Sequence, residues 1–483
     1  MRSVCIVVML AAIAPAARAD VAADRATLEQ AYATKLDELA RWCDEQKLSD
    51  QAARVRAWIM SADAFTLSVA VMRAVTEPPL PADASAAQRE FSERFAALRR
   101  AQADALFALA QEAGKQHRLS LAYELVAAAA RENSDHADAR RILGYQMREG
   151  RWLTTYEIDK AHGNQVWHER WGWLLRDRAA RYERGERFYR GTWMSVAEEA
   201  RRVGDVNTGW EVVTEHYSVR TNQSLEEGVR LATRLERLYR TWRQVFILYH
   251  ATEADVTAWL RGGTPKPPTP QRHKVVYFRT RDEYVAALVG KQPQIGVSTG
   301  YYDPDARTAY FFAGQQDDTT LYHEATHQLF AEVRSRRGPF GDSHNFWVVE
   351  GIACYMETLA DRGSYCLLGG TEAPRLLAAR YRTLKENFFV PLAELTAMDR
   401  VRFQGDPRLV KLYSEAAAMS HFLMHAEAGR YRDALDDYLF AVYMGRDRVN
   451  TLSELTGASY EQLDAAYRRF LESLPVESEP TSK

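Results

Sequence analysis

A His-Glu-Ala-Thr-His pattern at residues 323–327 lies in a segment whose residues favour a helix. Residues four apart lie one turn apart on the same face of an α-helix, so His323 and His327 can direct both imidazoles at one metal ion. Zinc accepts such nitrogen ligands in tetrahedral sites. Glu324 lies beside the pair, where its carboxylate can take a proton from water at the metal. The pattern therefore predicts one zinc ion per chain, with Glu324 as general base.

A catalytic zinc site needs a third protein ligand. Metzincins place a glycine three positions, and a histidine six positions, after the second histidine; neither is present here, which excludes that class. Glu350 lies in a second helix-forming segment, about 346–360, after a turn that contains glycine and proline. A helix that returns beside the first would bring Glu350 to the metal. Asp342 and His344, in the loop before this helix, remain alternative ligands.

Residues 347–357 follow the pattern Trp-x-x-Glu-Gly-x-Ala-x-Tyr-x-Glu. This segment resembles the second zinc helix of gluzincin metallopeptidases, in particular their aminopeptidase-N-like and peptidase-MA branches. The resemblance extends roughly from Lys274 to Met419. It implies that Gly351 follows the third ligand and that Glu357, two turns after that ligand, supports a ligand histidine by a hydrogen bond; a solvated surface position for Glu357 remains open. The implied zinc ligands are His323, His327 and Glu350.

Gluzincins often use a tyrosine or histidine from a later helix to donate a hydrogen bond to the tetrahedral intermediate. The segment Val410–Ala426 favours a helix in the corresponding part of the chain. Tyr413 is the first candidate in this segment and His421 the second. A purely structural role for Tyr413, with its ring in the core, remains an alternative.

The chain of 483 residues is long enough for several domains. We expect a mostly helical α+β protein. Residues 20–150 favour helices, and the pair Leu119–Ala130 and Asp135–Leu143 resembles one unit of a tetratricopeptide array. Residues 151–208 are rich in Trp, Tyr and Arg and are predicted to be a helical connector. Residues 209–483 would form the peptidase-MA-like domain, with zinc helices at about 319–334 and 346–360 and a helical tail over 371–474.

Three segments at the start of this last domain have the alternation or β-branched content of strands: Glu211–Thr221, Lys274–Thr280 and Thr308–Ala313. An amphipathic helix is predicted at Leu225–Phe246, and Gly300–Pro304 is predicted to be a turn. Together they indicate a small sheet with a packed helix. The strand Thr308–Ala313 is expected to be an edge that an extended peptide could join.

The N-terminus has the features of a cleavable signal peptide, with Arg2, an apolar run at 5–13 and Ala17-Arg18-Ala19 before the expected cleavage site. Export to the periplasm or the exterior would follow. Cys354 and Cys366 are close enough in sequence to form a disulfide there, although two buried thiols are as plausible. No later stretch is long and apolar enough to span a membrane. The net charge of -2 gives no basic excess for nucleic acid.

These observations predict a secreted zinc metallopeptidase that acts on a peptide or protein, with a possible protein partner at its helical N-terminal region. The sequence contains no Gly-x-Met-Glu-Asn signature of aminopeptidases, so exopeptidase activity is not supported. Two alternatives remain. The N-terminal half could be a binding scaffold attached to a relic zinc domain, or the zinc site could hydrolyse an amide in a cell-wall component.

Overall fold

The computed structural model describes residues 20–60, 63–70, 80–266, 271–314, 318–333 and 340–475. Within these ranges the chain is mostly helical with small sheets, which confirms the expected α+β class. The predicted signal peptide, residues 1–19, lies outside the described part. Among the helices that are described, none combines the length and apolar character needed to cross a membrane.

Helices make up most of the N-terminal region. The longest of them begins at a capping box, in which the side chains of Ser85 and Gln88 each accept a hydrogen bond from the other residue's backbone N–H. The two helices expected at Leu119–Ala130 and Asp135–Leu143 are present, and every residue of the first is buried. The helices of this region are α1 (Val21–Glu45), α2 (Ser49–Trp58), α3 (Ala86–Lys115), α4 (Leu119–Glu132) and α5 (Ala137–Ile142).

The expectation that residues 20–150 are helical is wrong at two segments, a strand at 66–70 and a hairpin strand at 146–148. β1 (Thr66–Ala70) is a strand that pairs antiparallel with β14 (Tyr365–Gly369), almost 300 positions later in the chain. Val69 lies opposite Cys366, and both side chains are buried. A strand of five residues becomes stable only through such a distant partner, and the local sequence contains no sign of that partner.

The prediction of a helical connector at 151–208 is also wrong, because this segment folds as β-hairpins that alternate with short helices. Cross-strand aromatic pairs stabilise the second and third hairpins, Trp167 opposite Trp173 and Phe188 opposite Trp193. The three units are β2 (Gln146–Arg148), β3 (Arg151–Leu153) and α6 (Thr155–His162); β4 (Gln165–His168), β5 (Gly172–Leu175), η1 (Arg176–Arg178) and α7 (Ala179–Glu183); and β6 (Glu186–Tyr189), β7 (Thr192–Ser195) and α8 (Val196–Arg202).

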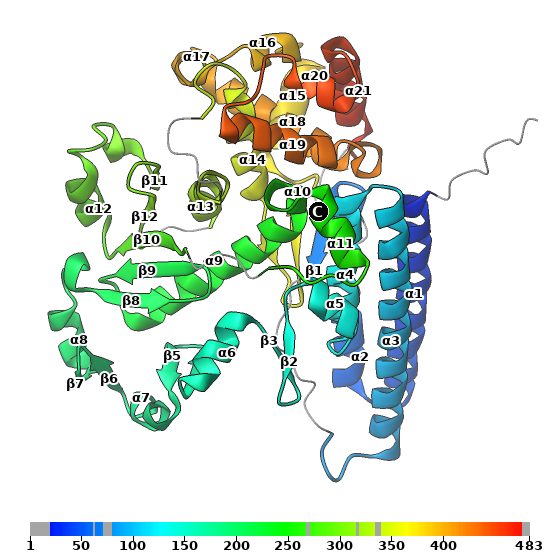
Figure 1. Cartoon of the computed structure of the whole chain (residues 1–483), viewed down its shortest axis with the longest axis vertical. Helices are drawn as coiled ribbons and strands as arrows, with labels where there is room; N and C mark the ends of the chain where they lie inside the picture. The colour runs from blue at the N-terminus through cyan, green and yellow to red at the C-terminus, as the bar shows by residue number, and fades with distance from the viewer. Residues whose placement is uncertain are drawn as a thin grey trace, which may run out of the picture.

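These units form an internal repeat that explains the tryptophan content of the segment. Trp152, Trp173 and Trp193 recur about every 20 residues, each in the second strand of its hairpin. Glycines with positive φ lie at the hairpin turns, such as Gly150 at 75° and Gly191 at 85°. In Figure 1 the three units follow one another in an arc below α9 (Leu225–Val245).

A five-stranded sheet follows, with the strand order β11-β12-β10-β9-β8. β10 is parallel to both of its neighbours, and the two outer pairs are antiparallel. The predicted strand Glu211–Thr221 is two strands joined by a tight turn. The strands are β8 (Trp210–Val213), β9 (Tyr217–Thr221), β10 (His273–Phe278), β11 (Tyr301–Asp303) and β12 (Thr308–Phe312); η2 (Val206–Thr208), α10 (Ile247–His250), α11 (Glu253–Leu260), α12 (Arg281–Leu288) and η3 (Ile295–Val297) complete this part.

Two expectations for this sheet are wrong, because the strand at its edge is β11 and not β12. The segment Gly300–Pro304, predicted to be a turn, contains strand β11, and the reversal comes after it. β12 therefore lies between β11 and β10 and is not an edge strand. The predicted helix at Leu225–Phe246 is confirmed as α9, which packs against β8 and β9.

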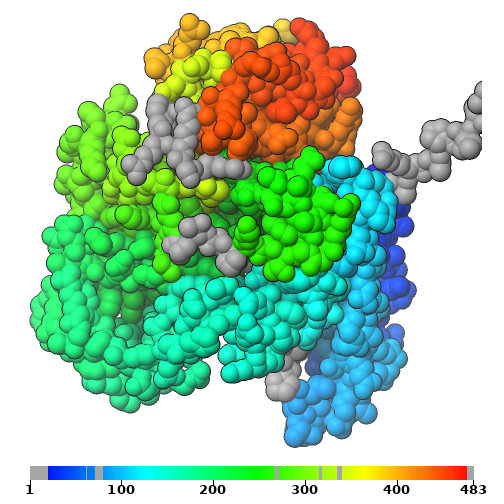
Figure 2. All heavy atoms as spheres, viewed as in Figure 1, coloured from blue at the N-terminus to red at the C-terminus, as the bar shows by residue number. Residues whose placement is uncertain are grey.

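Both predicted zinc helices are present, as α13 (Thr319–Glu332) and α14 (Phe346–Met356). From residue 357 to residue 475 the regular elements are helices, apart from the short strands β13 (Ala360–Asp361) and β14. In Figure 2 the C-terminal helices form a lobe at the top of the molecule. They are α15 (Pro374–Lys385), α16 (Leu392–Thr396), α17 (Arg400–Gly405), α18 (Leu409–Gly429), α19 (Arg432–Met444), α20 (Thr451–Thr456) and α21 (Tyr460–Ser473).

Candidate metal centre

The site is formed where α13 passes between the sheet and α14 (Figure 1). The start of α14 is fixed by Asn345, a fully buried residue in the left-handed conformation, with φ of 58°. Its amide nitrogen donates to Asp447 over 2.9 Å, and its amide oxygen accepts from the Tyr438 hydroxyl over 2.6 Å. Asparagine tolerates this backbone region better than most residues. The anchored start sets which residues of α14 face α13.

Three donor atoms from the two helices converge on one point. His323 Nε2 lies 3.1 Å from His327 Nε2 and 3.3 Å from Glu350 Oε2, and His327 Nε2 lies 3.7 Å from the same oxygen. Ligands about 2.0–2.1 Å from a tetrahedral zinc ion would be separated by roughly 3.3 Å. The donor set and its spacing therefore fit a single zinc-sized ion. The three side chains are mostly buried, with exposed fractions of 14%, 11% and 7%.

The charges at this point favour a cation. Burial opposes ionisation of Glu350, but the two imidazoles outweigh it and hold the pKa of this carboxyl well below its usual range. Burial likewise opposes a charge on His323, but contacts with Cys354 and two carboxylates outweigh it and raise the pKa of that imidazole well above its usual value. The same neighbours, Cys354 and the two carboxylates, that favour a proton on His323 would also favour a metal ion at its Nε2.

Glu357 supports His323 and is not a solvated surface residue. Its Oε1 lies 2.8 Å from His323 Nδ1, and the side chain is only 16% exposed. The imidazole can therefore donate from Nδ1 to the carboxylate and keep the Nε2 lone pair for a metal. Arg375, on α15, donates from Nε and Nη2 to Glu357 over 3.1 and 3.3 Å. Hydrogen bonds from His323 and Arg375 lower the pKa of Glu357 despite its burial.

Glu324 is held at the mouth of the site by β11. The backbone N–H of Tyr302 donates to Glu324 Oε2 over 2.9 Å. The chain before β11 can approach the helix because residue 300 is glycine: an added Cβ would lie 2.7 Å from Thr320 Cγ2 and 3.2 Å from Glu324 Cγ. The sheet edge thus orients the predicted general base.

Gly351, the residue after Glu350, allows α14 and α18 to cross closely. A Cβ at this position would lie 2.5 Å from the carbonyl oxygen of Ala416 and 2.7 Å from Ser420 Oγ. The close crossing brings Tyr413, one turn before Ala416, to the metal ligands. Burial, and next the nearby Glu350 carboxylate, raise the pKa of the Tyr413 phenol. Tyr413 therefore remains a protonated donor.

The other candidates lie elsewhere. His421 is buried on α18, with its ring 4.9 Å from that of Tyr355, and burial lowers its pKa well below the usual value. His344 Nδ1 lies 2.6 Å from Asp447, so this ring is tied to the C-terminal lobe. Asp342 is exposed and belongs to no described metal-type cluster. The geometry favours Glu350 over both loop residues as third ligand.

Cys354 and Cys366 do not form a disulfide: both are buried thiols, as is Cys43. Cys354 instead lies beside the candidate metal centre, where its sulfur, a ring nitrogen of His323 and a Glu357 oxygen are all within 4.8 Å of one another. Neither Arg375 nor Tyr302 was identifiable from the sequence as part of the site. Each reaches it through a fold contact, and neither belongs to a recognisable spacing motif.

No protein-family model matches this chain, and a search of curated proteins found no significant match. The assignment of the site therefore depends on its own geometry.

Proposed function

We propose that the chain is a zinc-dependent metallopeptidase of the gluzincin type, with His323, His327 and Glu350 as the metal ligands. The observation that carries the proposal is the arrangement around these donors. One further carboxylate, Glu324, and one protonated phenol, Tyr413, lie beside the same point from different elements. A purely structural zinc site would have four protein ligands and no need of either group.

The chemistry follows from these groups. Zinc, when bound, supplies Lewis acidity that makes amide hydrolysis feasible at neutral pH. Glu324 Oε2 is fixed by the Tyr302 N–H, which leaves Oε1 to accept the proton of the attacking water and to return it to the leaving amine. Tyr413 donates a hydrogen bond to the oxyanion that forms on the substrate carbonyl. Glu357 and Arg375 keep His323 in the orientation that its ligand role requires.

The substrate that fits this site best is an extended peptide. Strand β11 is the edge of the five-stranded sheet and also holds Glu324, so a peptide that lies along β11 would pass beside the general base. β11 therefore takes the place of β12 as the proposed peptide-binding edge, because β12 is paired on both sides. Export through the segment 1–19 and a protein-binding role for the helical, tetratricopeptide-like N-terminal region belong to the same proposal.

The decisive experiment compares the chain from Asp20 onward with its Glu324→Gln and Glu38→Gln variants. Glu38 is exposed on α1 and provides the same change of charge far from the site. We expect about one zinc per chain in all three proteins. Hydrolysis of casein should fall by about a hundredfold or more in Glu324→Gln alone. Unchanged hydrolysis in that variant would refute the assigned base.

Assays on the same purified proteins also distinguish the metallopeptidase from the two alternatives, a cell-wall amidohydrolase and a binding scaffold. Cleavage of peptidoglycan with none of casein would indicate a cell-wall amidohydrolase. Stoichiometric zinc without turnover of either substrate would favour the scaffold. No zinc after supplementation, with the His323→Ala/His327→Ala variant indistinguishable from the wild type, would refute the metal site itself.

A further inference from the structure

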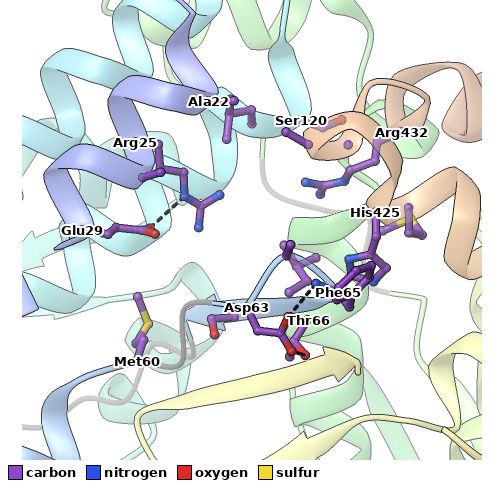
Figure 3. A pocket seen from close by; sticks show the side chains of 18 of the residues that line it. Ala22, Arg25, Glu29, Met60, Asp63, Phe65, Thr66, Ser120, His425 and Arg432 are labelled. Atoms are coloured by element: carbon purple, nitrogen blue, oxygen red, sulfur yellow. Dashed lines mark hydrogen bonds and ion pairs between the residues drawn. The ribbon is translucent and has the colours of Figure 1, made fainter. Parts of the chain in front are cut away.

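A cavity of about 1070 Å³ lies where the N-terminal helices meet the C-terminal lobe. Its walls come from α1, from the start of α4, from the segment around β1 and from the turn between α18 and α19. None of the proposed metal ligands lines it, so it is separate from the metal centre. Pockets for small molecules usually have volumes of roughly 300–1,000 Å³, so this cavity is large enough for one. Figure 3 shows it from close by.

Three arginines from three different elements surround one end of the cavity. They are Arg25 on α1, Arg118 directly before α4, and Arg432 at the start of α19. Figure 3 shows the side chains of Arg25 and Arg432 extending towards the same space. Arginines that are only partly exposed need acceptors for their five N–H groups, and they repel one another at short range. Their partners therefore decide whether the cluster is complete.

The carboxylates around this cluster are unevenly distributed: Arg25 and Arg432 have several close by, including Asp433 and Asp436 near Arg432, whereas Arg118 has one weak contact. Glu124 forms an ion pair with Arg432 and also lies 3.5 Å from an Arg25 nitrogen, so it serves two cations. Arg25 has a second partner in Glu29, at 2.8 Å. Arg118 donates to the carbonyl of Ala428 over 3.1 Å, and its carboxylate contact is the exposed Asp20 at 4.0 Å. An anion in the cavity would therefore give Arg118 the close acidic partner that it lacks.

Arg432 has a buried nitrogen that lacks an acceptor among the residues that the structure describes. Its side chain is 10% exposed, and within the described part of the protein its buried Nε has no hydrogen-bond partner. Burial is the main cause that lowers the pKa of Arg432 to about 10; Arg25 and Arg118 act in the same direction, and Asp433 and Asp436 oppose them. A buried guanidinium under such conditions gains from an additional anion.

The backbone that presents Arg432 is strained. Glu427 and Ala428, which line the cavity, are two consecutive non-glycine residues in the left-handed region, with φ of 50° and 54°. Each such residue costs roughly 1 kcal/mol or more, and strain of this kind is concentrated at ligand and switch sites. The strained turn directs the Ala428 carbonyl to Arg118 and ends shortly before Arg432, the first residue of α19.

We propose that this cavity binds a small organic anion, with its carboxylate or phosphate group at Arg25, Arg118 and Arg432. The remainder of the cavity is largely apolar, and Met60 and Phe65 project into it (Figure 3). The ligand therefore has an apolar body as well as a charged group. This inference does not depend on peptidase activity. It gives the N-terminal helices a role in ligand binding, because they supply two of the three cations.

Calorimetric titration of the chain from Asp20 onward tests the proposal with three probes of equal chain length: octanoate, octyl phosphate and the neutral octanamide. We expect at least one anion to bind at least about tenfold more tightly than octanamide, because only the anions can bond the arginines as charges. The stronger of the two anions identifies which head group the site prefers. Equal affinity for octanamide, or no heat with either anion at millimolar concentration, would overturn the proposal.

A substitution adds an independent check. Arg118→Gln removes one cation without leaving a buried carboxylate unpaired, and we expect it to weaken anion binding by about tenfold or more while octanamide binding is unchanged. Arg100→Gln, at an exposed position on α3, is the matched control. Equal effects of the two substitutions would refute the arginine site. If Arg118→Gln does not fold, the comparison of probes on the wild type still decides.

Discussion

The close crossing of α14 and α18 at Gly351 predicts the effect of Gly351→Ala. The added methyl group should reduce catalytic turnover while the protein still binds its metal ion. In Gly351→Ala the new Cβ would lie 2.5 Å from the Ala416 carbonyl oxygen, where ordinary contacts begin at about 3.4 Å. The obstructing atom belongs to the backbone of a buried helix, so no side chain can rotate away. The helices must separate locally by up to about 0.9 Å.

The cost of this separation can be worked out from the packing. Overpacking of a buried contact typically costs about 1–3 kcal/mol, and an obstructing backbone atom places this substitution in the upper half of that range. Tyr413 lies one turn before Ala416 and would move with α18. A misplacement of about 1 Å in a catalytic group can reduce turnover about a hundredfold. The contacts between α13 and α14 do not involve α18, so the three metal donors should keep their spacing.

The assay combines zinc content, melting temperature and hydrolysis of casein for the wild type, Gly351→Ala and Gly290→Ala. Gly290 has no heavy atom within 4 Å of an added Cβ and no positive φ, so it is the matched control. We expect Gly351→Ala to retain zinc, to melt a few degrees lower and to lose about 99% of its turnover. Wild-type melting and turnover would refute the close crossing. Loss of zinc would show that α18 positions Glu350 and not only Tyr413.

Two other substitutions test the electrostatics of the same lobe. Glu357→Gln should weaken zinc binding by about 10–100-fold, measured by competition with a chelator, because His323 loses its carboxylate partner; unchanged affinity would show that the hydrogen bond is dispensable. Burial raises the pKa of Glu415, on α18, from 4.5 to about 8. The folded state therefore holds this proton more tightly than the unfolded state, and its contribution to stability is full below pH 4.5 and lost as the pH rises to about 8. The loss is at most about 5 kcal/mol. Glu415→Gln should melt higher than the wild type at pH 8 and not at pH 4.5, and an equal shift at both values would contradict the raised pKa.

Local patterns predicted the elements whose signal is complete within one segment. The helices α9, α13 and α14 and the strands β10 and β12 have clear periodicity or β-branched content, and all are present. The elements that were missed depend on partners elsewhere. β1 needs β14, and each hairpin of the repeat has strands of only three or four residues. In such short strands the tryptophans look irregularly spaced until the period of about 20 residues is recognised.

The metal donors were predictable for a similar reason. His323 and His327 are fixed relative to each other by one helix, and Glu350 is associated with a recognisable neighbour, Gly351. The groups that tune these donors were less visible, because Arg375 reaches the site from α15 and Tyr302 from a sheet edge. Their contribution depends on the packing of separate elements, and no spacing in the sequence encodes it.

The contacts between the two halves of the chain also determine how the role of the N-terminal region can be tested. β1 pairs with β14, which follows the helix that bears Glu350. Arg131, on α4, donates to Ser364 in the turn before β14 over 2.9 Å, and Glu124 forms an ion pair with Arg432. Removal of residues 20–208 would expose a strand edge and leave Arg432 buried without its partner, a loss that commonly costs several kcal/mol. Inactivity of such a truncated chain would therefore report a damaged catalytic lobe, and point substitutions in the N-terminal half are the informative alternative.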